Sequence, residues 1–179
     1  GFTAYEPIIL TKLDNMEVAS HIANQIDVHH PKSVFVDVGA VGSGVVDRLH
    51  QLGYNMVQEI SFGSKAADTK RYTNKRAEMW YNIKRWLDDG GCLPNLPDLK
   101  TELTSIEYKF DKTGRIALEP KEKVKEKLGK SPDLADGLAL TFAQKIIGVS
   151  EDVQYNDHMF TNIHQSEGFY NPLKSMNRG

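Results

Sequence analysis

The chain has 179 residues, which suits one domain of ordinary size and leaves no room for a second large one. Its net charge of -2 and isoelectric point near 6.3 differ from those of strongly basic nucleic-acid-binding domains, so any DNA-binding surface would be local. The single cysteine, Cys92, excludes an intramolecular disulfide, and no apolar run is long enough to span a membrane, so we expect a cytosolic protein.

The first segments indicate a strand followed by a helix. Residues 6–13 are largely apolar after Pro7 and predict a strand. Asp14 is a good N-cap for a helix with apolar residues at helical spacing through Ile26, and Pro31 ends that helix.

The next segments repeat the alternation. Residues 34–36 form an unbroken apolar run that ends at Asp37, which is typical of a parallel strand covered on both faces. Residues 42–52 predict a helix closed by Gly53, and residues 55–62 predict another strand.

The second half of the chain begins with a basic loop at residues 64–73. Trp80, Ile83 and Leu87 then recur at helical spacing, which predicts an amphipathic helix with these residues in the core. Residues 106–110 and 115–118 alternate apolar and polar residues around a turn, which predicts a hairpin outside the main sheet.

A last helix is predicted over residues 132–147, and residues 148–179 show no sustained periodicity and indicate a loose tail. The expected organisation is therefore one domain over residues 1–147 followed by a tail over 148–179. The alternation of strands and helices predicts an α/β fold with a mostly parallel sheet.

Two groups of carboxylates stand out. Asp37 lies where an apolar strand ends, which is where open α/β sheets usually present ligands, although a turn or helix-capping role would also explain it. In the last helix, Ser131 is a good N-cap and Pro132 suits the first helical position, so that Asp133 could merely complement the helix dipole.

Asp136 does not fit that explanation, because helical projection places it on the apolar arc of the same helix. A buried carboxylate is costly unless it is paired or binds a metal, and Asp133 lies one turn away. Oxygen ligands without a Cys or His cluster favour Mg²⁺ or Mn²⁺, and a pair of such ions can hydrolyse phosphodiester bonds.

Several ordered segments resemble the nuclease domain of phage and prophage terminase large subunits, over about residues 5–146 of this chain. These are Val34-Phe35-Val36-Asp37-Val38-Gly39 with the following Gly42 to Leu49, then Phe62-Gly63-Ser64, Tyr72 to Trp80, and Ser131 to Phe142. The resemblance implies a ribonuclease H-like mixed sheet flanked by helices, with an auxiliary hairpin. It also implies that Asp37 is the second catalytic carboxylate and that Asp133 or Asp136 supplies the last metal ligand.

The sequence departs from the family pattern in one respect. The family's first catalytic Asp lies on a strand that precedes the one expected at residues 8–10, and no such strand precedes Gly1, so the resemblance implies a site that is incomplete in this chain. The family also carries its packaging ATPase upstream, and no phosphate-binding loop of that kind occurs here. Implied partners are double-stranded DNA, that ATPase domain, the portal and the small terminase subunit, in the cytoplasm of a bacterial host.

Positive charge concentrates in two stretches that could follow DNA phosphates. A solvated helix face is the alternative, particularly for the second stretch, where glutamates interleave with lysines. We predict DNA contacts at Lys65, Lys70, Arg71, Lys75, Arg76 and Lys130.

The sequence thus predicts a terminase endonuclease that cleaves concatemeric viral DNA by two-metal hydrolysis, with Asp37, Asp133 and Asp136 as catalytic metal ligands. Two alternatives stay open. The spacing of Asp133 and Asp136 also resembles that of Holliday-junction resolvases, which are structure-specific. A chain that lacks the first carboxylate could instead be a non-catalytic module that docks DNA or a portal.

Overall fold

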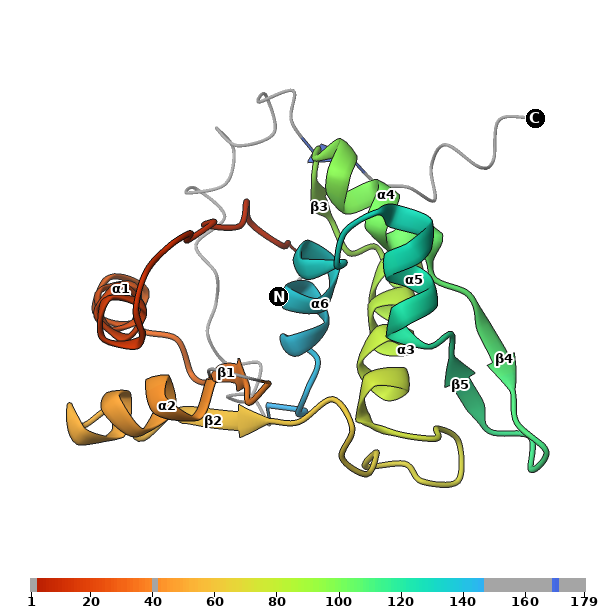
Figure 1. Cartoon of the computed structure of the whole chain (residues 1–179), viewed down its shortest axis with the longest axis horizontal. Coiled ribbons are helices and arrows are strands. Elements are labelled where there is room, and N and C mark those ends of the chain that lie inside the picture. The colour runs from red at the N-terminus through yellow and green to blue at the C-terminus, as the bar shows by residue number, and fades with distance from the viewer. Residues whose placement is uncertain (1–2, 40–41, 147–168, 171–179) are drawn as a thin grey trace, which may run out of the picture.

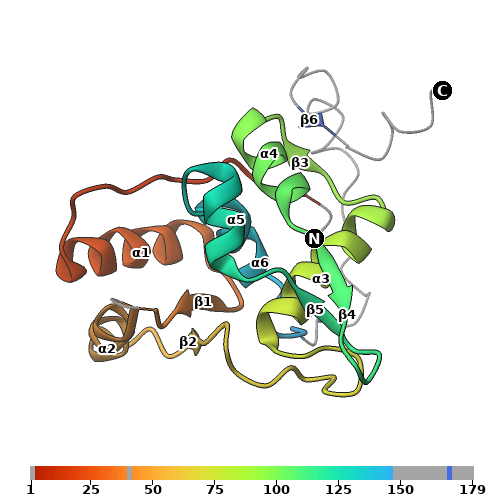
Figure 2. The same ribbon diagram turned by 45° about the vertical axis from the view of Figure 1, so that its right-hand side comes forward.

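Two groups of helices and strands lie side by side in the computed structural model, which describes residues 3–39, 42–146 and 169–170 (Figure 1). The first group covers residues 15–60 and the second residues 75–140, with a β-hairpin that projects on the side away from the first helix (Figures 1 and 2). This is the α/β architecture with an auxiliary hairpin that the sequence predicted, but the predicted mostly parallel sheet is wrong, because the described residues form three two-stranded sheets of which one is parallel.

Helix α1 (Asn15–His29) begins where its capping signal stands in the sequence. The Asp14 carboxylate accepts hydrogen bonds from the backbone N–H groups of Met16 (2.8 Å) and Glu17 (2.9 Å), and the Glu17 carboxylate accepts one from Asp14 N–H. This reciprocal pairing satisfies backbone donors that would otherwise be left open at a helix start. The predicted start of the helix is confirmed.

Strands β1 (Val34–Asp37) and β2 (Val57–Ile60) pair in parallel, and helix α2 (Gly42–Gln51) connects them. Val34, Val36 and Val57 pack with the apolar residues of α1 and α2. Phe35 and Ile60 belong instead to the cluster formed by α3 and α6. Both faces of this strand pair are therefore covered, as predicted, although the four residues of β1 are only half-buried.

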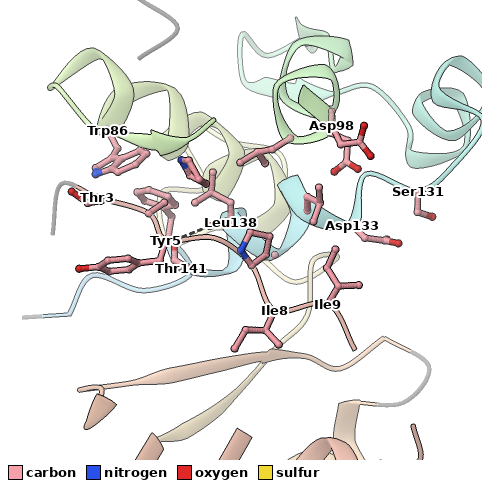
Figure 3. A pocket seen from close by; sticks show the side chains of 18 of the residues that line it. Thr3, Tyr5, Ile8, Ile9, Trp86, Asp98, Ser131, Asp133, Leu138 and Thr141 are labelled. Carbon is pink, nitrogen blue, oxygen red and sulfur yellow. Dashed lines mark hydrogen bonds between the residues drawn. The ribbon is translucent and has the colours of Figure 1, made fainter. Parts of the chain in front are cut away.

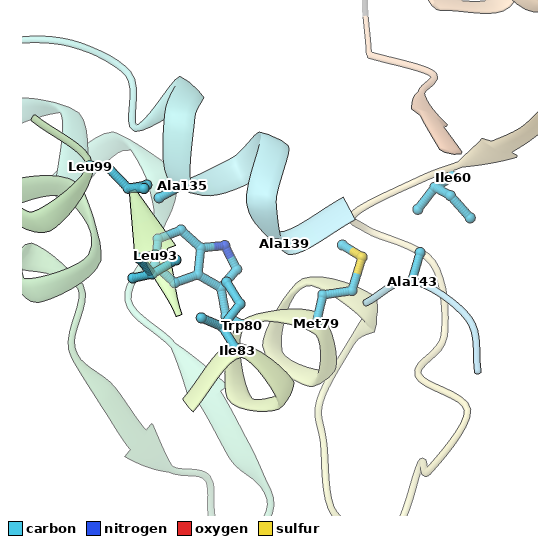
Figure 4. Packing of buried hydrophobic residues seen from close by; sticks show 9 residues of the cluster. All are labelled: Ile60, Met79, Trp80, Ile83, Leu93, Leu99, Ala135, Ala139 and Ala143. Carbon is cyan, nitrogen blue, oxygen red and sulfur yellow. The ribbon is translucent and has the colours of Figure 1, made fainter. Parts of the chain in front are cut away.

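The second group is built on helices α3 (Lys75–Asp88), α4 (Pro97–Ser105) and α6 (Asp133–Leu140). Met79, Trp80 and Ile83 of α3 face Ala135 and Ala139 of α6, and the small alanines let the two helices approach closely (Figure 4). Trp80 and Ile83 are core residues, as the periodicity predicted.

The hairpin consists of β4 (Tyr108–Phe110) and β5 (Ile116–Leu118), which pair antiparallel. Its turn contains Gly114 at a φ of 80°, a conformation that suits glycine. The predicted basic loop runs beside β5 through a bridge between Tyr72 and Ile116. A third strand pair joins β3 (Leu93–Pro94) to β6 (Phe169–Tyr170).

The predictions for residues 6–13 and for the last helix were wrong, and two helices were missed. Residues 6–13 form no strand, because they pair with no other strand in the described part of the chain and a strand needs a ladder partner. Helices α4 and α5 (Lys121–Leu128) were not predicted at all. Helix α6 begins at Asp133 and ends at Leu140, so it is shorter than the predicted helix over 132–147, and Ser131 does not cap it.

The predicted tail, residues 148–179, lies outside the described residues except for the two residues of β6. Within the described residues, the structure contains no helix with the length and apolar character that a membrane crossing requires.

Candidate active site

Strands β1 and β2 end at the same edge of their sheet, because they are parallel and Asp37 is paired with Ile60. The backbone N–H of Val38 donates to the carbonyl of Ile60 at 3.0 Å and extends the ladder by one residue. Side chains that follow the two strands therefore gather at one place, which is where open α/β sheets usually carry ligands.

Asp37 is fixed at this edge by the glycines that follow it. Its carboxylate accepts a hydrogen bond from Gly39 N–H at 3.1 Å, as in a turn. Gly42, at the start of α2, packs so closely that a Cβ there would lie 1.9 Å from the carbonyl oxygen of Asp37. Only glycine permits this approach of α2 to the strand end, which positions the carboxylate.

Asp136 is 6% exposed, and each of its oxygens faces a different partner. The Trp80 indole N–H donates to Oδ1 at 3.0 Å. The Lys121 ammonium lies 2.9 Å from Oδ2, but the contact lacks hydrogen-bond alignment, so Oδ2 has an ion-pair partner and no hydrogen bond among the described residues. The prediction that Asp136 points inward from its helix is confirmed.

Contacts of Lys121 connect Asp136 to the edge that presents Asp37. The Lys121 ammonium lies 6.0 Å from the centre of the Phe62 ring. Phe62 follows Ile60 by two residues, and Ile60 is the register partner of Asp37. Helix α6 also packs against β1. Helix α6, which carries Asp136, and its partner Lys121 therefore lie beside the strand pair that presents Asp37.

Arg76 lies beside this carboxylate and is 8% exposed. Its Nη1 donates to the backbone carbonyl of Glu119 at 2.9 Å, and its guanidinium carbon lies 5.9 Å from the Trp80 ring centre. Burial lowers the pKa of Arg76, and the negative charges of Asp136, Glu122 and Glu119 oppose that effect. The guanidinium therefore compensates buried negative charge and is not presented at the surface.

Asp133 occupies a different position, although it is only one helical turn away. It is exposed at the first residue of α6 and lines a cavity of about 850 Å³ together with Pro7, Ile8 and Ile9 (Figure 3). Asp136 does not line this cavity. Within the described residues no three His, Cys, Asp or Glu side chains come close enough to hold a metal ion together.

The six predicted DNA-contacting residues also fall into two sets. Lys65, Lys70 and Arg71 are exposed and make no ion pair within the described residues. Lys75 pairs with Glu78 at 2.8 Å and Arg76 is buried. The Lys130 ammonium lies 2.7 Å from Asp98 and 3.6 Å from Glu102; the hydrogen bond to Asp98 is the main reason that its pKa is raised.

Comparisons with known proteins show what this arrangement is similar to. No family model matches the chain, and no curated protein matches it in sequence. The nuclease domain of the large terminase subunit gp2 of bacterial virus Sf6 matches in structure with a TM-score of 0.58 and 21% identity, over 72% of this chain and 71% of that one. A lysine-to-alanine mutant of that domain with manganese matches with a TM-score of 0.60 and 21% identity, over 76% of each chain.

A lysine-to-alanine mutant with calcium also matches, with a TM-score of 0.56 and 21% identity, over 72% of this chain and 71% of that one. The chain has the terminase nuclease fold. The resemblance read from the sequence is thus confirmed at the level of the fold, which is ribonuclease H-like.

The sequence did not indicate the polar contacts that three side chains of this terminase nuclease fold make. Lys121 stood among interleaved lysines and glutamates that indicated a solvated surface, and Trp80 was assigned to the core without a polar role. Glu102, 1% exposed, accepts a hydrogen bond from Ala135 N–H at 2.9 Å and caps α6 from another helix. The partners of these residues are distant in sequence, so no local pattern indicates them.

Proposed function

We propose that this chain is a metal-dependent endonuclease domain of the terminase type, which hydrolyses phosphodiester bonds of duplex DNA. One observation carries the proposal: a buried carboxylate, Asp136, has an oxygen with an ion-pair partner but no hydrogen bond among the described residues, and its helix packs against the strand that presents Asp37. The fold likeness to terminase nuclease domains, two of which are named with manganese or calcium, supports it.

Asp37 and Asp136 are the residues that would hold a divalent cation. Both offer carboxylate oxygens, which suit Mg²⁺ and Mn²⁺. A bound ion of this type supplies charge neutralisation at the scissile phosphate and activation of water. We also propose that two ions bind, which requires more oxygen ligands than these two residues provide.

The other polar residues of the site act on Asp136. The indole of Trp80 fixes the orientation of the carboxylate, and Lys121 and Arg76 compensate its charge in a buried setting, where an unpaired carboxylate would be costly. Lys121 is about two-fifths exposed, so its side chain can leave Oδ2 when a cation approaches. We assign Asp133 no metal-binding role, because it faces the cavity beside residues 3–9.

Lys65, Lys70 and Arg71 are the proposed contacts to the phosphates of the duplex, because they are exposed and free of ion pairs within the described residues. We also propose that the domain cleaves concatemers during packaging, in the cytoplasm of a bacterial host. A packaging ATPase, a portal and a small terminase subunit are the corresponding proposed partners.

The test compares Asp37→Asn, Asp136→Asn and Asp133→Asn in plasmid nicking with Mn²⁺ and in calorimetric titration of Mn²⁺. We expect Asp37→Asn and Asp136→Asn to lose about a hundredfold or more in rate, since even outer-shell partners of metal ligands are worth 10–100-fold. Asp133→Asn is the matched control and should stay within a few-fold of wild type.

Circular dichroism would establish that the three variants fold alike. Wild-type nicking rates in both Asp37→Asn and Asp136→Asn, or a wild-type protein that binds no Mn²⁺, would overturn the assignment. Cleavage of four-way junctions with no cleavage of linear duplex would favour the resolvase alternative instead.

A further inference from the structure

Exposed aromatic rings gather where the hairpin meets helix α3. Tyr108 and Phe110 of β4 point to one side of the strand, are 54% and 64% exposed, and touch edge to face at a centre distance of 6.1 Å. Tyr81 of α3 continues the row, 6.4 Å from Tyr108. Clustered exposed rings of this size usually mark an interaction site, because a monomer gains nothing by leaving them in water.

Positive charge accompanies these rings. The Arg71 guanidinium lies 5.2 Å from the centre of the Tyr81 ring. Lys84 and Arg85 follow Tyr81 by three and four residues on α3, which places them on the same helix face. Lys84 pairs with Asp88, whereas Arg71 and Arg85 form no ion pair within the described residues. The surface therefore offers cations between and beside open aromatic faces.

The nearby carboxylates are already engaged. Asp68 accepts hydrogen bonds from the backbone N–H groups of Lys70 and Arg71, each at 3.1 Å. Asp111, in the hairpin turn, pairs with Arg115 at 2.8 Å. Asp111 therefore has its own counterion, and Asp68, which keeps its negative charge, forms no ion pair with Arg71 or Arg85 among the described residues, so these two cations can accept an anionic ligand.

The row is also held in a fixed geometry. Ile116 N–H donates to the carbonyl of Arg71 at 2.8 Å, and Thr73 N–H donates to the carbonyl of Ile116 at 3.0 Å, so that the basic loop is joined to the hairpin by backbone hydrogen bonds. Beneath them Ile116 is buried with Tyr72 and Ala77. A preformed surface loses less entropy when it binds.

We propose that this surface, made of Arg71, Tyr81, Lys84, Arg85, Tyr108 and Phe110, binds unpaired nucleotides of single-stranded DNA. Bases stack on the open faces of Tyr108 and Phe110, while Arg71 and Arg85 contact phosphates. Duplex DNA is a poorer match, because its bases are stacked on each other and cannot reach the rings. The proposal does not depend on cleavage, since the surface contains neither Asp37 nor Asp136, although it shares Arg71 with the proposed contacts to duplex DNA.

The test measures fluorescence anisotropy of a labelled oligothymidylate of about 12 nucleotides, within the site sizes of single-strand-binding modules. A blunt duplex is measured in parallel, and EDTA excludes any metal-dependent cleavage. We expect Tyr108→Ala and Phe110→Ala each to weaken single-strand binding by roughly five- to a hundredfold, as loss of one base–aromatic stack does. Duplex binding should change less than about twofold, because phosphate contacts remain.

Two further variants separate stacking from plain apolar contact. Phe110→Tyr keeps the ring and should bind as wild type, whereas Phe110→Leu keeps an apolar side chain without a ring and should lose affinity. Leu52→Ala, directly after α2 and 46% exposed in wild type, is the control for loss of an exposed apolar group elsewhere. Thermal melts should be the same for all of them.

Three results would overturn the proposal. The first is full single-strand affinity in Phe110→Leu, which would show an apolar docking surface instead. The second is equal loss of single-strand and duplex binding in Phe110→Ala, which would show a general DNA surface. The third is a wild-type protein that does not bind the oligothymidylate, whatever the outcome of the nicking assay.

Discussion

The two halves of this molecule are stabilised in different ways. The half made of α1, β1, α2 and β2 is joined by an apolar cluster that includes Val46 and Leu49, and none of its described residues is both charged and buried. The other half contains every buried charged residue in the described part of the chain: Arg76 and Glu78 on α3, Glu102 on α4, and Asp136 on α6.

Three of these four buried charges are matched by a partner more than 30 positions away in the sequence. Asp136 is bound by Trp80, which is 56 positions away, and Glu102 caps α6 at Ala135, which is 33 positions away. Arg76 donates to the carbonyl of Glu119, 43 positions away. Burying such groups without partners would cost several kcal/mol. The proposed active-site carboxylate therefore lies in the half whose arrangement depends on long-range polar contacts.

The largest effect on stability is expected in the apolar half. Leu49→Ala removes a side chain with 0% exposure and should lower the free energy of unfolding by about 2–5 kcal/mol, through lost burial and a cavity. Urea denaturation followed by circular dichroism measures this. Leu52→Ala, which removes a 46% exposed side chain one turn later, should stay within about 0.5 kcal/mol. Equal losses in the two variants would contradict an apolar core at α2.

The sequence was most informative in this same half. Asp14 and Glu17 indicate the start of α1, because their hydrogen bonds are made within one helical turn. The apolar run before Asp37 indicates β1, because this strand is covered on both faces. Local patterns were sufficient there. They also placed Asp136 on the buried side of its helix, since that follows from helical periodicity alone.

Local patterns failed where structure depends on distant partners. Ser131 has the chemistry of an N-cap, but α6 is capped by Glu102 from another helix. Residues 6–13 have strand-like composition, yet Ile8 and Ile9 are 64% and 69% exposed and no described strand pairs with them. Lys121 could not be recognised as the partner of Asp136, because nothing in a run of lysines and glutamates distinguishes it. Spatial proximity decided each of these cases.

A smaller effect tests whether Trp80 and Asp136 act as a unit. Trp80→Phe removes the indole donor and leaves Oδ1 of a buried carboxylate without its hydrogen bond, which should cost about 1–3 kcal/mol. A double-mutant cycle with Asp136→Asn, measured by urea denaturation, isolates the coupling, which should lie between about 0.5 and 3 kcal/mol.

If the effects of Trp80→Phe and Asp136→Asn simply add, the two residues are independent and the long-range contact is not what positions the carboxylate. A parallel titration with Mn²⁺ extends the test to function. Trp80→Phe should bind Mn²⁺ more weakly, by 10–100-fold as for other outer-shell changes at metal sites, whereas a purely structural role would leave the affinity unchanged.

The smallest expected effect is a pH dependence of stability that arises from Glu78, in the half built on α3 to α6. Burial, the largest single influence, would raise the pKa of Glu78, but hydrogen bonds from Lys75 and from the backbone N–H groups of Ala67 and Asp68 together lower it below its ordinary value of 4.5. A carboxylate with a lowered pKa in the folded state stabilises the fold above its unfolded pKa. That contribution is lost as the pH falls through the folded pKa.

Glu78→Gln replaces charge-assisted hydrogen bonds with neutral ones and should cost about 1 kcal/mol at neutral pH. Because glutamine does not titrate, the difference from wild type should be constant from about pH 5 to 7 and should shrink as the pH falls below 4.5. Thermal unfolding across this range measures it. Asp47→Asn, which changes an exposed carboxylate on α2, should follow the wild-type curve. A Glu78→Gln difference that stays constant down to the lowest pH would show that the Glu78 charge does not stabilise the second half.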